Sequence, residues 1–312
     1  MRFHLSFILL LWLAVNCAAQ LPPIFADTKR EIVSAKTIAE FPVNTFLENI
    51  AVDTESDLYI NSYEEGKIYR VSPDGKKSDF AKIDGKIAGL AFDKQQNLIV
   101  TGWARGTTPS VFRVDRRGMV ETLTAIDGAM FLNGITPLIN DRFLIADSYK
   151  GVIWEFDAKT KKYSIWLADE TLLRRDNKNG TPGVNGLKIR GSVLYATNTQ
   201  NQKIFRIPLL AGNRAGKPEL FVDRVNGDDF AFDSSGNLFL TTHVYNSVLK
   251  ITPSGTTSII AENGNVTGDT SLAFGRGKYK NTIFVVTNGG MSLPLAEGVQ
   301  PAKVVRIDIV KK

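Results

Sequence analysis

Four side chains that carry oxygen ligands stand at equivalent places along the chain, each just before a short apolar run. They are Glu48, Asn133, Asn185 and Asp228, and the two other equivalent places hold Ala88 and Thr270. Carboxylate and amide oxygens suit a hard cation, and Ca²⁺ is favoured over Mg²⁺ because it tolerates irregular geometry. Zinc is disfavoured, since these places offer neither sulfur nor imidazole. The four residues predict a calcium site that another divalent cation could also occupy.

The stretch VNGDDFAFD places two acids, Asp228 and Asp229, side by side. Their charges repel unless a cation or solvent balances them. We expect Asp228 to bind the ion, Asp229 to accept hydrogen bonds behind it or orient its neighbour, and the Thr270 hydroxyl to lie nearby at the rim. The alternative is turn chemistry, because Asn and Asp before a strand commonly bond to nearby backbone. Four strong oxygen donors in six equivalent places favour the metal site.

Six internal repeats are the elements that must bring these positions together. Three close copies, NIAVDTESDLYIN, GLAFDKQQNLIVT and DFAFDSSGNLFLT, each predict a strand, a polar turn and a second strand. Looser copies occupy residues 134–146, 186–197 and 271–287. A third short strand follows each copy, and a fourth follows most of them. Units of roughly 40 to 50 residues with four antiparallel strands are typical of a β-propeller, whereas a β-sandwich would not repeat its motif six times.

The ends of the repeat array predict how the ring closes. The sixth unit lacks a fourth strand, and the segment EIVSAKTIAEF at residues 31–41 has no partner in the first unit. We expect this N-terminal strand to join the last blade, which removes two exposed sheet edges. The predicted fold is thus an all-β, six-bladed propeller in one domain, residues 20–312. In such a ring the six equivalent positions converge at the mouth of the central channel.

The first 19 residues resemble a secretory signal peptide. One Arg precedes an apolar run over residues 5–15, and the small residues Ala18 and Ala19 follow. This pattern predicts cleavage after Ala19 and a secreted or periplasmic protein. The run is shorter than the about 20 residues that a membrane span needs, so no membrane span is expected after removal. A lipid on Cys17 is the alternative, although Asn16 is a poor residue for the position before it.

Composition argues against a nucleic-acid-binding protein and against a fold held together by disulfides. The formal net charge is +6, but the 38 Lys and Arg residues are scattered among 32 acids without a long basic run. This distribution argues against nucleic acid as a partner. The single cysteine, Cys17, lies in the predicted signal peptide, so the mature protein would stand without disulfides, and its length suffices to bury a core unaided. A small molecule is the expected partner, and no feature indicates an oligomeric state.

The chain is similar to the calcium-dependent lactonase superfamily that includes regucalcin (senescence marker protein) and gluconolactonase, with diisopropyl fluorophosphatase and paraoxonase as more distant relatives. The resemblance covers residues 46–309 and rests on Glu48 in LENIAVD, Asn133 in FLNGI, Asn185 in GVNGL and Asp228 in GDDFAFD. It implies that these four residues bind Ca²⁺ and that Asp228 acts as general base or nucleophile. In that chemistry the cation polarises a lactone or ester carbonyl while the carboxylate activates water.

Two departures narrow what the resemblance implies. Regucalcin-type sugar lactonases carry an Arg two residues before the third-blade Asn, where this chain has Phe131. A sugar acid lactone is therefore less expected than a more apolar lactone or ester. A paired-histidine mechanism of the paraoxonase kind is excluded, because only His243 remains after signal removal.

Aromatic and basic residues after the second strand of each repeat are the candidate substrate contacts. A mostly apolar pocket with a few polar groups is the usual form of a small-molecule site. Two long insertions, residues 169–183 and 288–302, are candidate lids over it. The candidate contacts, together with the residue that replaces the family Arg, are Tyr63, Trp103, Arg105, Phe131, Tyr149, His243, Tyr245 and Met291.

The leading functional hypothesis is a secreted metal-dependent hydrolase of the lactonase or esterase type. The alternative is a non-enzymatic binding propeller that a cation merely stiffens, since propellers host many functions. A strictosidine-synthase-like enzyme would need a catalytic Glu that no motif here identifies. Phosphotriester hydrolysis could accompany lactone hydrolysis at the same cation.

Overall fold

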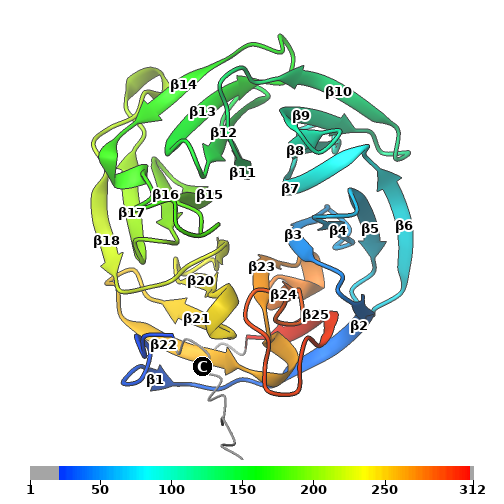
Figure 1. The fold of residues 1–312 in the computed structure, drawn as a ribbon, viewed down its shortest axis with the longest axis vertical. Helices are drawn as coiled ribbons and strands as arrows, with labels where there is room; N and C mark the ends of the chain where they lie inside the picture. The colour runs from blue at the N-terminus through cyan, green and yellow to red at the C-terminus, as the bar shows by residue number, and fades with distance from the viewer. Residues whose placement is uncertain (1–20, 310–312) are drawn as a thin grey trace, which may run out of the picture.

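The computed structural model describes residues 21–309. The predicted signal peptide, residues 1–19, and its cleavage position lie outside the described residues. Six antiparallel sheets surround a common axis, each with four strands, and one sheet adds a fifth (Figure 1). This arrangement confirms the all-β, six-bladed propeller. Within residues 21–309, no helix is long and apolar enough to cross a membrane.

The first three blades follow the sequence repeats, and in each blade the strand nearest the axis comes first (Figure 1). Blade 1 contains β3 (Leu47–Val52), β4 (Leu58–Ser62), β5 (Lys67–Val71) and β6 (Lys77–Lys82). Blade 2 contains β7 (Gly85–Phe92), β8 (Leu98–Ala104), β9 (Thr108–Val114) and β10 (Val120–Ala125). Blade 3 contains β11 (Leu132–Pro137), β12 (Arg142–Asp147), β13 (Val152–Asp157) and β14 (Tyr163–Ala168).

The last three blades repeat this order, with the N-terminal strands added to blades 5 and 6. Blade 4 contains β15 (Val184–Arg190), β16 (Val193–Asn198), β17 (Lys203–Pro208) and β18 (Glu219–Asp223). Blade 5 contains β19 (Phe230–Phe232), β20 (Leu238–Thr241), β21 (Ser247–Ile251), β22 (Thr257–Glu262) and β1 (Lys29–Arg30). Blade 6 contains β23 (Asp269–Phe274), β24 (Thr282–Thr287), β25 (Pro301–Asp308) and β2 (Ala35–Val43).

Short 3₁₀ turns lie in the connections between strands. They are η1 (Glu170–Leu172), η2 (Ala211–Asn213), η3 (His243–Tyr245), η4 (Gly264–Val266) and η5 (Gly277–Tyr279).

The N-terminal segment closes the ring as the repeat array predicted. Strand β2 runs antiparallel to β25, with Ala35 opposite Ile307 and Phe41 opposite Ala302. The strand begins four residues later than the predicted segment 31–41. Before it, β1 pairs in parallel with β22 of blade 5, a contact that the sequence did not predict. The N-terminal segment therefore joins the outer edges of two neighbouring blades.

Apolar residues form six buried clusters, and each cluster lies between two neighbouring blades. The alternation of side chains along each strand explains this, because one face of every blade packs against the preceding blade and the other face against the following blade. Phe143, Phe239 and Phe284 are among the largest side chains that are fully buried. Burying one such ring contributes about 1.5–3 kcal/mol. The repeated packing fixes the position of each inner strand around the axis.

Candidate metal and substrate site

The inner strands are irregular where the predicted ligands lie. A regular strand would direct alternate side chains into the two neighbouring blade interfaces. A β-bulge breaks that alternation and re-aims a side chain, so Glu48, Asn133 and Asn185 escape the packing between blades. The pairing of inner strand with second strand shifts register at residues 47–49, 132–135 and 184–187.

Threonine hydroxyls hold the backbone of the predicted ligands across blade interfaces. Thr101 on β8 donates to the Asn133 carbonyl (2.7 Å). Thr197 on β16 donates to the Asp228 carbonyl (2.9 Å) and accepts from the Gly186 N–H (2.8 Å). Each threonine thus ties one inner strand to the next. The bonds of Thr197 hold the backbone of Asn185 and Asp228, the ligands of blades 4 and 5, at a fixed spacing.

The glycine of each Asn-Gly pair is required by the close approach of the next blade. A Cβ on Gly134 would lie 2.2 Å from the Asn185 carbonyl oxygen, and one on Gly186 would lie 2.6 Å from the Asp228 carbonyl oxygen. Atoms cannot approach so closely, so any larger residue would push the blades apart. In the motif FLNGI, Asn133 is a candidate ligand, and Gly134 leaves room for the backbone of Asn185, the ligand of the next blade.

The four predicted ligands line one cavity of about 220 Å³. They come from four blades and are separated by up to 180 residues of sequence, yet all four border the same space. Apolar rings and a few polar groups complete the wall. The lining residues are Phe46, Glu48, Tyr63, Phe131, Asn133, Tyr149, Gly180, Pro182, Asn185, Thr199, Asp228, His243 and Ser292.

The Asn185 amide is oriented so that its oxygen stays available. Its Nδ2 donates to Asp228 Oδ1 (2.6 Å) and to Thr199 Oγ1 (3.0 Å). The Thr199 hydroxyl in turn donates to the Gly227 carbonyl (2.7 Å), so it must accept from Asn185. Since Nδ2 serves both acceptors, Oδ1 is left for a ligand. The Asn133 side chain is nearly buried and makes no hydrogen bond among residues 21–309.

The two carboxylates of the set lie in an electronegative and poorly solvated place. Burial raises the pKa of Glu48 well above its ordinary value, and the charges of Asp228 and Asp229 raise it further. In the part of the chain that the structure describes, neither Glu48 nor Asp228 forms an ion pair with Lys or Arg. A divalent cation would offset this repulsion.

The donor chemistry therefore fits a hard cation, with Glu48, Asn133, Asn185 and Asp228 as the side chains that would hold it. Within residues 21–309 no three His, Cys, Asp or Glu side chains gather as a metal cluster. The fit consequently depends on the two amide oxygens as well as the two carboxylates. Such mixed oxygen sets are characteristic of Ca²⁺ rather than of transition metals.

The Asp229 carboxylate, unlike that of Asp228, is surrounded by hydrogen-bond donors of the protein. It accepts from the Lys188 ammonium (2.6 Å), from Ser271 Oγ (2.8 Å) and from Asn49 Nδ2 (3.3 Å). It does not line the cavity. The expectation that Asp229 accepts hydrogen bonds agrees with these contacts, and Lys188 is a partner that sequence reasoning missed.

An aromatic wall is defined as Phe46, Tyr63, Trp103, Phe131 and Tyr149. Four of these rings line the cavity, and Trp103, which is not among the lining residues, packs against Tyr63 and Phe131. Four members of the wall were predicted from their places after second strands or before an inner strand, and Phe46 was missed although it directly precedes β3. Burial raises the pKa of Tyr63, so this hydroxyl stays protonated. The ring centroids are 5.7 Å apart for Phe46 and Tyr63, 6.0 Å for Tyr63 and Trp103, 4.6 Å for Trp103 and Phe131, and 4.9 Å for Phe131 and Tyr149.

Four other predicted residues are not among those that line the cavity. Thr270 is buried and donates to the Leu47 carbonyl (2.7 Å), which joins blade 6 to blade 1. The Tyr245 hydroxyl donates to the Pro22 carbonyl (3.0 Å), so this ring fastens the N-terminal segment. Arg105 is exposed on the β8–β9 turn, and Met291 is half-buried in the segment 288–300.

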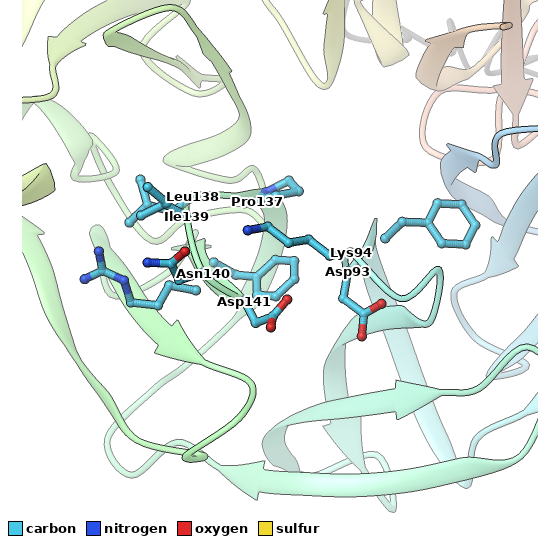
Figure 2. A pocket seen from close by; sticks show the side chains of 10 residues that line it. Asp93, Lys94, Pro137, Leu138, Ile139, Asn140 and Asp141 are labelled. Carbon is cyan, nitrogen blue, oxygen red and sulfur yellow. The ribbon is translucent and has the colours of Figure 1, made fainter.

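A separate hollow lies at the opposite end of the blades. Figure 2 shows Asp93 and Lys94, from the β7–β8 turn, facing the segment from Pro137 to Asp141 between β11 and β12. None of the predicted ligands or predicted substrate contacts lines it. The candidate site is therefore confined to the end of the propeller where the inner strands begin.

Comparisons with known proteins identify a family and related proteins. The family model described as the SMP-30/gluconolactonase/LRE-like region matches residues 50–289. A curated relative from Phoma sp., a putative hetero-Diels-Alderase, is 23% identical over 94% of this chain and 97% of its own length.

Solved structures of low sequence identity share the fold. A calcium-binding protein, regucalcin, from Agrobacterium tumefaciens has a TM-score of 0.71 and is 15% identical, covering 90% of this chain and 95% of its own. A gluconolactonase from Xanthomonas campestris has a TM-score of 0.69 and is 14% identical, covering 91% and 92%.

Proposed function

Given that the chain belongs to the SMP-30/gluconolactonase/LRE-like family, we propose that it is an enzyme that hydrolyses a lactone or ester with the help of Ca²⁺. The observation that supports this proposal is the convergence of Glu48, Asn133, Asn185 and Asp228 on one cavity. When bound, the cation would polarise the substrate carbonyl and stabilise the oxyanion. The remaining steps fall to side chains of the chain itself.

Asp228 is the proposed general base. Its Oδ1 accepts from Asn185 (2.6 Å) and its Oδ2 faces His243 Nδ1 (3.2 Å), so both oxygens are held in place at the cavity. Asp228 takes a proton from water as the water oxygen bonds to the carbonyl carbon. The ester C–O bond then breaks, and the proton passes to the departing alkoxide. Direct attack by Asp228 on the carbonyl is the nucleophilic variant of the same role.

The aromatic wall determines the proposed substrate class. Phe131 occupies the place where the family resemblance expects Arg, and its ring packs against Trp103 (4.6 Å) and Tyr149 (4.9 Å). Such a surface binds flat or apolar groups, and Phe131 cannot give a sugar acid carboxylate the cation that an Arg at this place would supply. We therefore propose a lactone or ester with an aryl or alkyl substituent, small enough for a cavity of about 220 Å³.

A second candidate function is a hetero-Diels-Alder cycloaddition, which two observations favour. The curated relative with that name matches this chain over nearly its whole length, and the aromatic wall could stack a diene against its partner. Such a reaction gains mainly from proximity and orientation and needs no proton transfer. It therefore predicts that turnover depends on the aromatic wall more than on the Asp228 carboxylate.

The test is turnover of chelated and Ca²⁺-reloaded protein on a panel of aryl and alkyl lactones and esters. The proposal expects hydrolysis that disappears on chelation and returns with Ca²⁺. Hydrolysis that survives exhaustive chelation would refute the metal-dependent mechanism. Stabilisation by Ca²⁺ without hydrolysis would support a binding propeller, and cyclised products from a diene substrate would support the second candidate.

Export is a further part of this proposal and concerns residues 1–19. The apolar run and the small residues before Gln20 support secretion. N-terminal sequencing of protein recovered outside the producing cells should begin at Gln20. Recovery of the chain inside the cells with Met1 or Arg2 intact would oppose it.

A further inference from the structure

His243 connects Asp228 to the segment between β24 and β25. Its Nδ1 lies 3.2 Å from Asp228 Oδ2, and its Nε2 lies 2.8 Å from Asn288 Nδ2 and 3.0 Å from Ser292 Oγ. The ring packs edge-on against Phe46, with centroids 5.8 Å apart. Both ring nitrogens are therefore engaged, one by the proposed base and the other by blade 6.

The orientation of the Asn288 amide is fixed by the backbone that follows it. Asn288 Oδ1 accepts from the N–H groups of Gly290 (2.9 Å) and Met291 (3.1 Å). The residue is fully buried, and its own N–H donates to the Gly268 carbonyl (2.9 Å). Its Nδ2 must therefore point toward His243 and donate to it.

The Asn288 amide N–H determines which tautomer the His243 imidazole adopts. A ring nitrogen that faces an amide N–H must accept, so Nε2 carries no proton and the proton lies on Nδ1. Nδ1–H then donates to Asp228 Oδ2. The Asp228 carboxylate is thus held from both sides, by Asn185 at Oδ1 and by His243 at Oδ2.

The backbone at His243 forms a tight turn. Its φ is 52°, in the left-handed region that residues other than glycine seldom adopt. The turn is closed by the Asn246 N–H, which donates to the His243 carbonyl (3.2 Å). Other non-glycine residues among those described share this conformation, so the backbone governs only which replacement for His243 the turn tolerates, and Asn is suitable.

We propose that Asn288 and His243 act as a pair that positions Asp228, with Asn288 selecting the tautomer and His243 directing the carboxylate into the cavity. The effect on turnover rests on the proposed function, whereas the tautomer does not. Ser292, His243 and Asp228 also lie in the order of a nucleophilic triad. The single lone pair of Nε2 is already taken by the buried Asn288 amide, which argues against Ser292 as the nucleophile.

The decisive variant is Asn288→Asp. It preserves the size of the side chain and the oxygen that accepts from Gly290 and Met291, but it replaces the donor to Nε2 by an acceptor. We expect kcat to fall by about 10- to 100-fold, the usual cost of losing a partner that orients a metal-site ligand, with KM changed less than about threefold. Asn281→Asp, an exposed site on the same blade, controls for the added charge.

Imidazole ¹⁵N NMR of the full chain supplies a readout independent of turnover. The His243 signals are identified by their absence in His243→Asn, which suits the left-handed backbone. The expected result is a protonated Nδ1 and an unprotonated Nε2 in the parent protein, with Nε2 protonated in Asn288→Asp. A proton on Nε2 of the parent protein would overturn the proposal.

Ser292→Ala separates the positioning pair from a nucleophilic triad. We expect this variant to retain kcat within about tenfold, whereas loss of a nucleophile costs far more. A larger loss in Ser292→Ala than in Asn288→Asp would overturn the proposal in favour of the triad. If the parent protein hydrolyses no substrate, the proposed function fails, and the tautomer in parent and Asn288→Asp protein still decides whether the pair exists.

Discussion

Asp228 and Asp229 are adjacent and almost equally buried, at 7% and 4% exposure, yet the protein treats their charges differently. The Asp229 carboxylate has an ammonium partner in Lys188, at 2.6 Å, and three neutral donors. Among residues 21–309, the Asp228 carboxylate has polar contacts only with Asn185 and His243, and it borders the cavity. The protein neutralises Asp229 with its own cation, Lys188. Asp228, at the cavity, has no such partner in the described chain, so a bound metal cation could balance its charge.

This difference separates a structural carboxylate from a candidate functional one. Removing one partner of a buried ion pair leaves an uncompensated charge and destabilises the fold. A carboxylate at the cavity costs less stability when it is removed, since its repulsion with Glu48 is also relieved. Substitution of the two residues should therefore affect different quantities, the turnover in one case and the free energy of unfolding in the other.

The largest expected effect is on turnover, in Asp228→Asn. This change keeps the shape and removes the charge, so the proposed base and one Ca²⁺ ligand are lost together. We expect kcat/KM for hydrolysis to fall by about 10² to 10⁴, the usual contribution of general-base catalysis, with a lower Ca²⁺ affinity by calorimetry. Far-ultraviolet circular dichroism should match the parent protein. Turnover within tenfold of the parent would remove Asp228 from the mechanism.

Lys188→Met should act on stability instead. It leaves Asp229 without its cation, and we expect the free energy of unfolding in urea to fall by about 1–3 kcal/mol, below the cost for a fully buried pair because Lys188 is partly exposed. The double variant Lys188→Met with Asp229→Asn should recover most of this loss. If the double variant is no more stable than Lys188→Met, the ion pair is not the reason for the loss.

Phe131→Arg tests whether the aromatic wall selects the substrate. The change breaks the ring contacts with Trp103 and Tyr149 and places a cation at the cavity. We expect kcat/KM to fall by about tenfold for apolar substrates, the range that one apolar contact contributes, and to rise for substrates with a carboxylate. The comparison of matched methyl-substituted and carboxylate-substituted lactones gives the ratio. An unchanged ratio would mean that Phe131 does not contact substrate.

A third buried aspartate, Asp269, can be compared with Asp228 and Asp229 through its effect on the pH dependence of stability, which is the smallest effect expected. Asp269 is fully buried, its Oδ1 has no hydrogen-bond partner in the described chain, and burial raises its pKa well above the ordinary value. The folded state then binds this proton more tightly than the unfolded state does. Its contribution to stability is therefore present at low pH and is lost as the pH rises from about 4 through the raised pKa.

Asp269→Asn removes this titration. Thermal unfolding of parent and variant between about pH 4 and 7 should show a steeper loss of stability with rising pH in the parent protein. Parallel curves would show that Asp269 does not titrate in this range. Asp233→Asn, in the partly buried β19–β20 turn where the carboxylate accepts from the Asn237 N–H (2.9 Å), is the matched control.

Much of the fold could be predicted because the repeats report directly on local structure. Apolar alternation marked the strands, and the missing fourth strand of the last unit indicated closure by the N-terminus. The parallel pairing of β1 with β22 escaped prediction, since two exposed residues, Lys29 and Arg30, carry no alternation to mark a strand.

The candidate ligands could be found because they occupy equivalent places in a repeat. Lys188 and Asn288 could not, as neither place recurs with a matching residue in the other units. Lys188 lies three residues after Asn185, a spacing that puts side chains on opposite faces of a regular strand. The bulge at residues 184–187 breaks this alternation and lets both reach toward blade 5.

The sequence by itself determined the six units, their closure and the oxygen chemistry at the start of each inner strand, because these depend on local pattern and on symmetry. The tertiary structure alone decided which charge has an internal partner, which rings form the aromatic wall and how His243 is oriented. Those features depend on bulges and on segments from different blades meeting in space, and no spacing along one chain encodes such meetings.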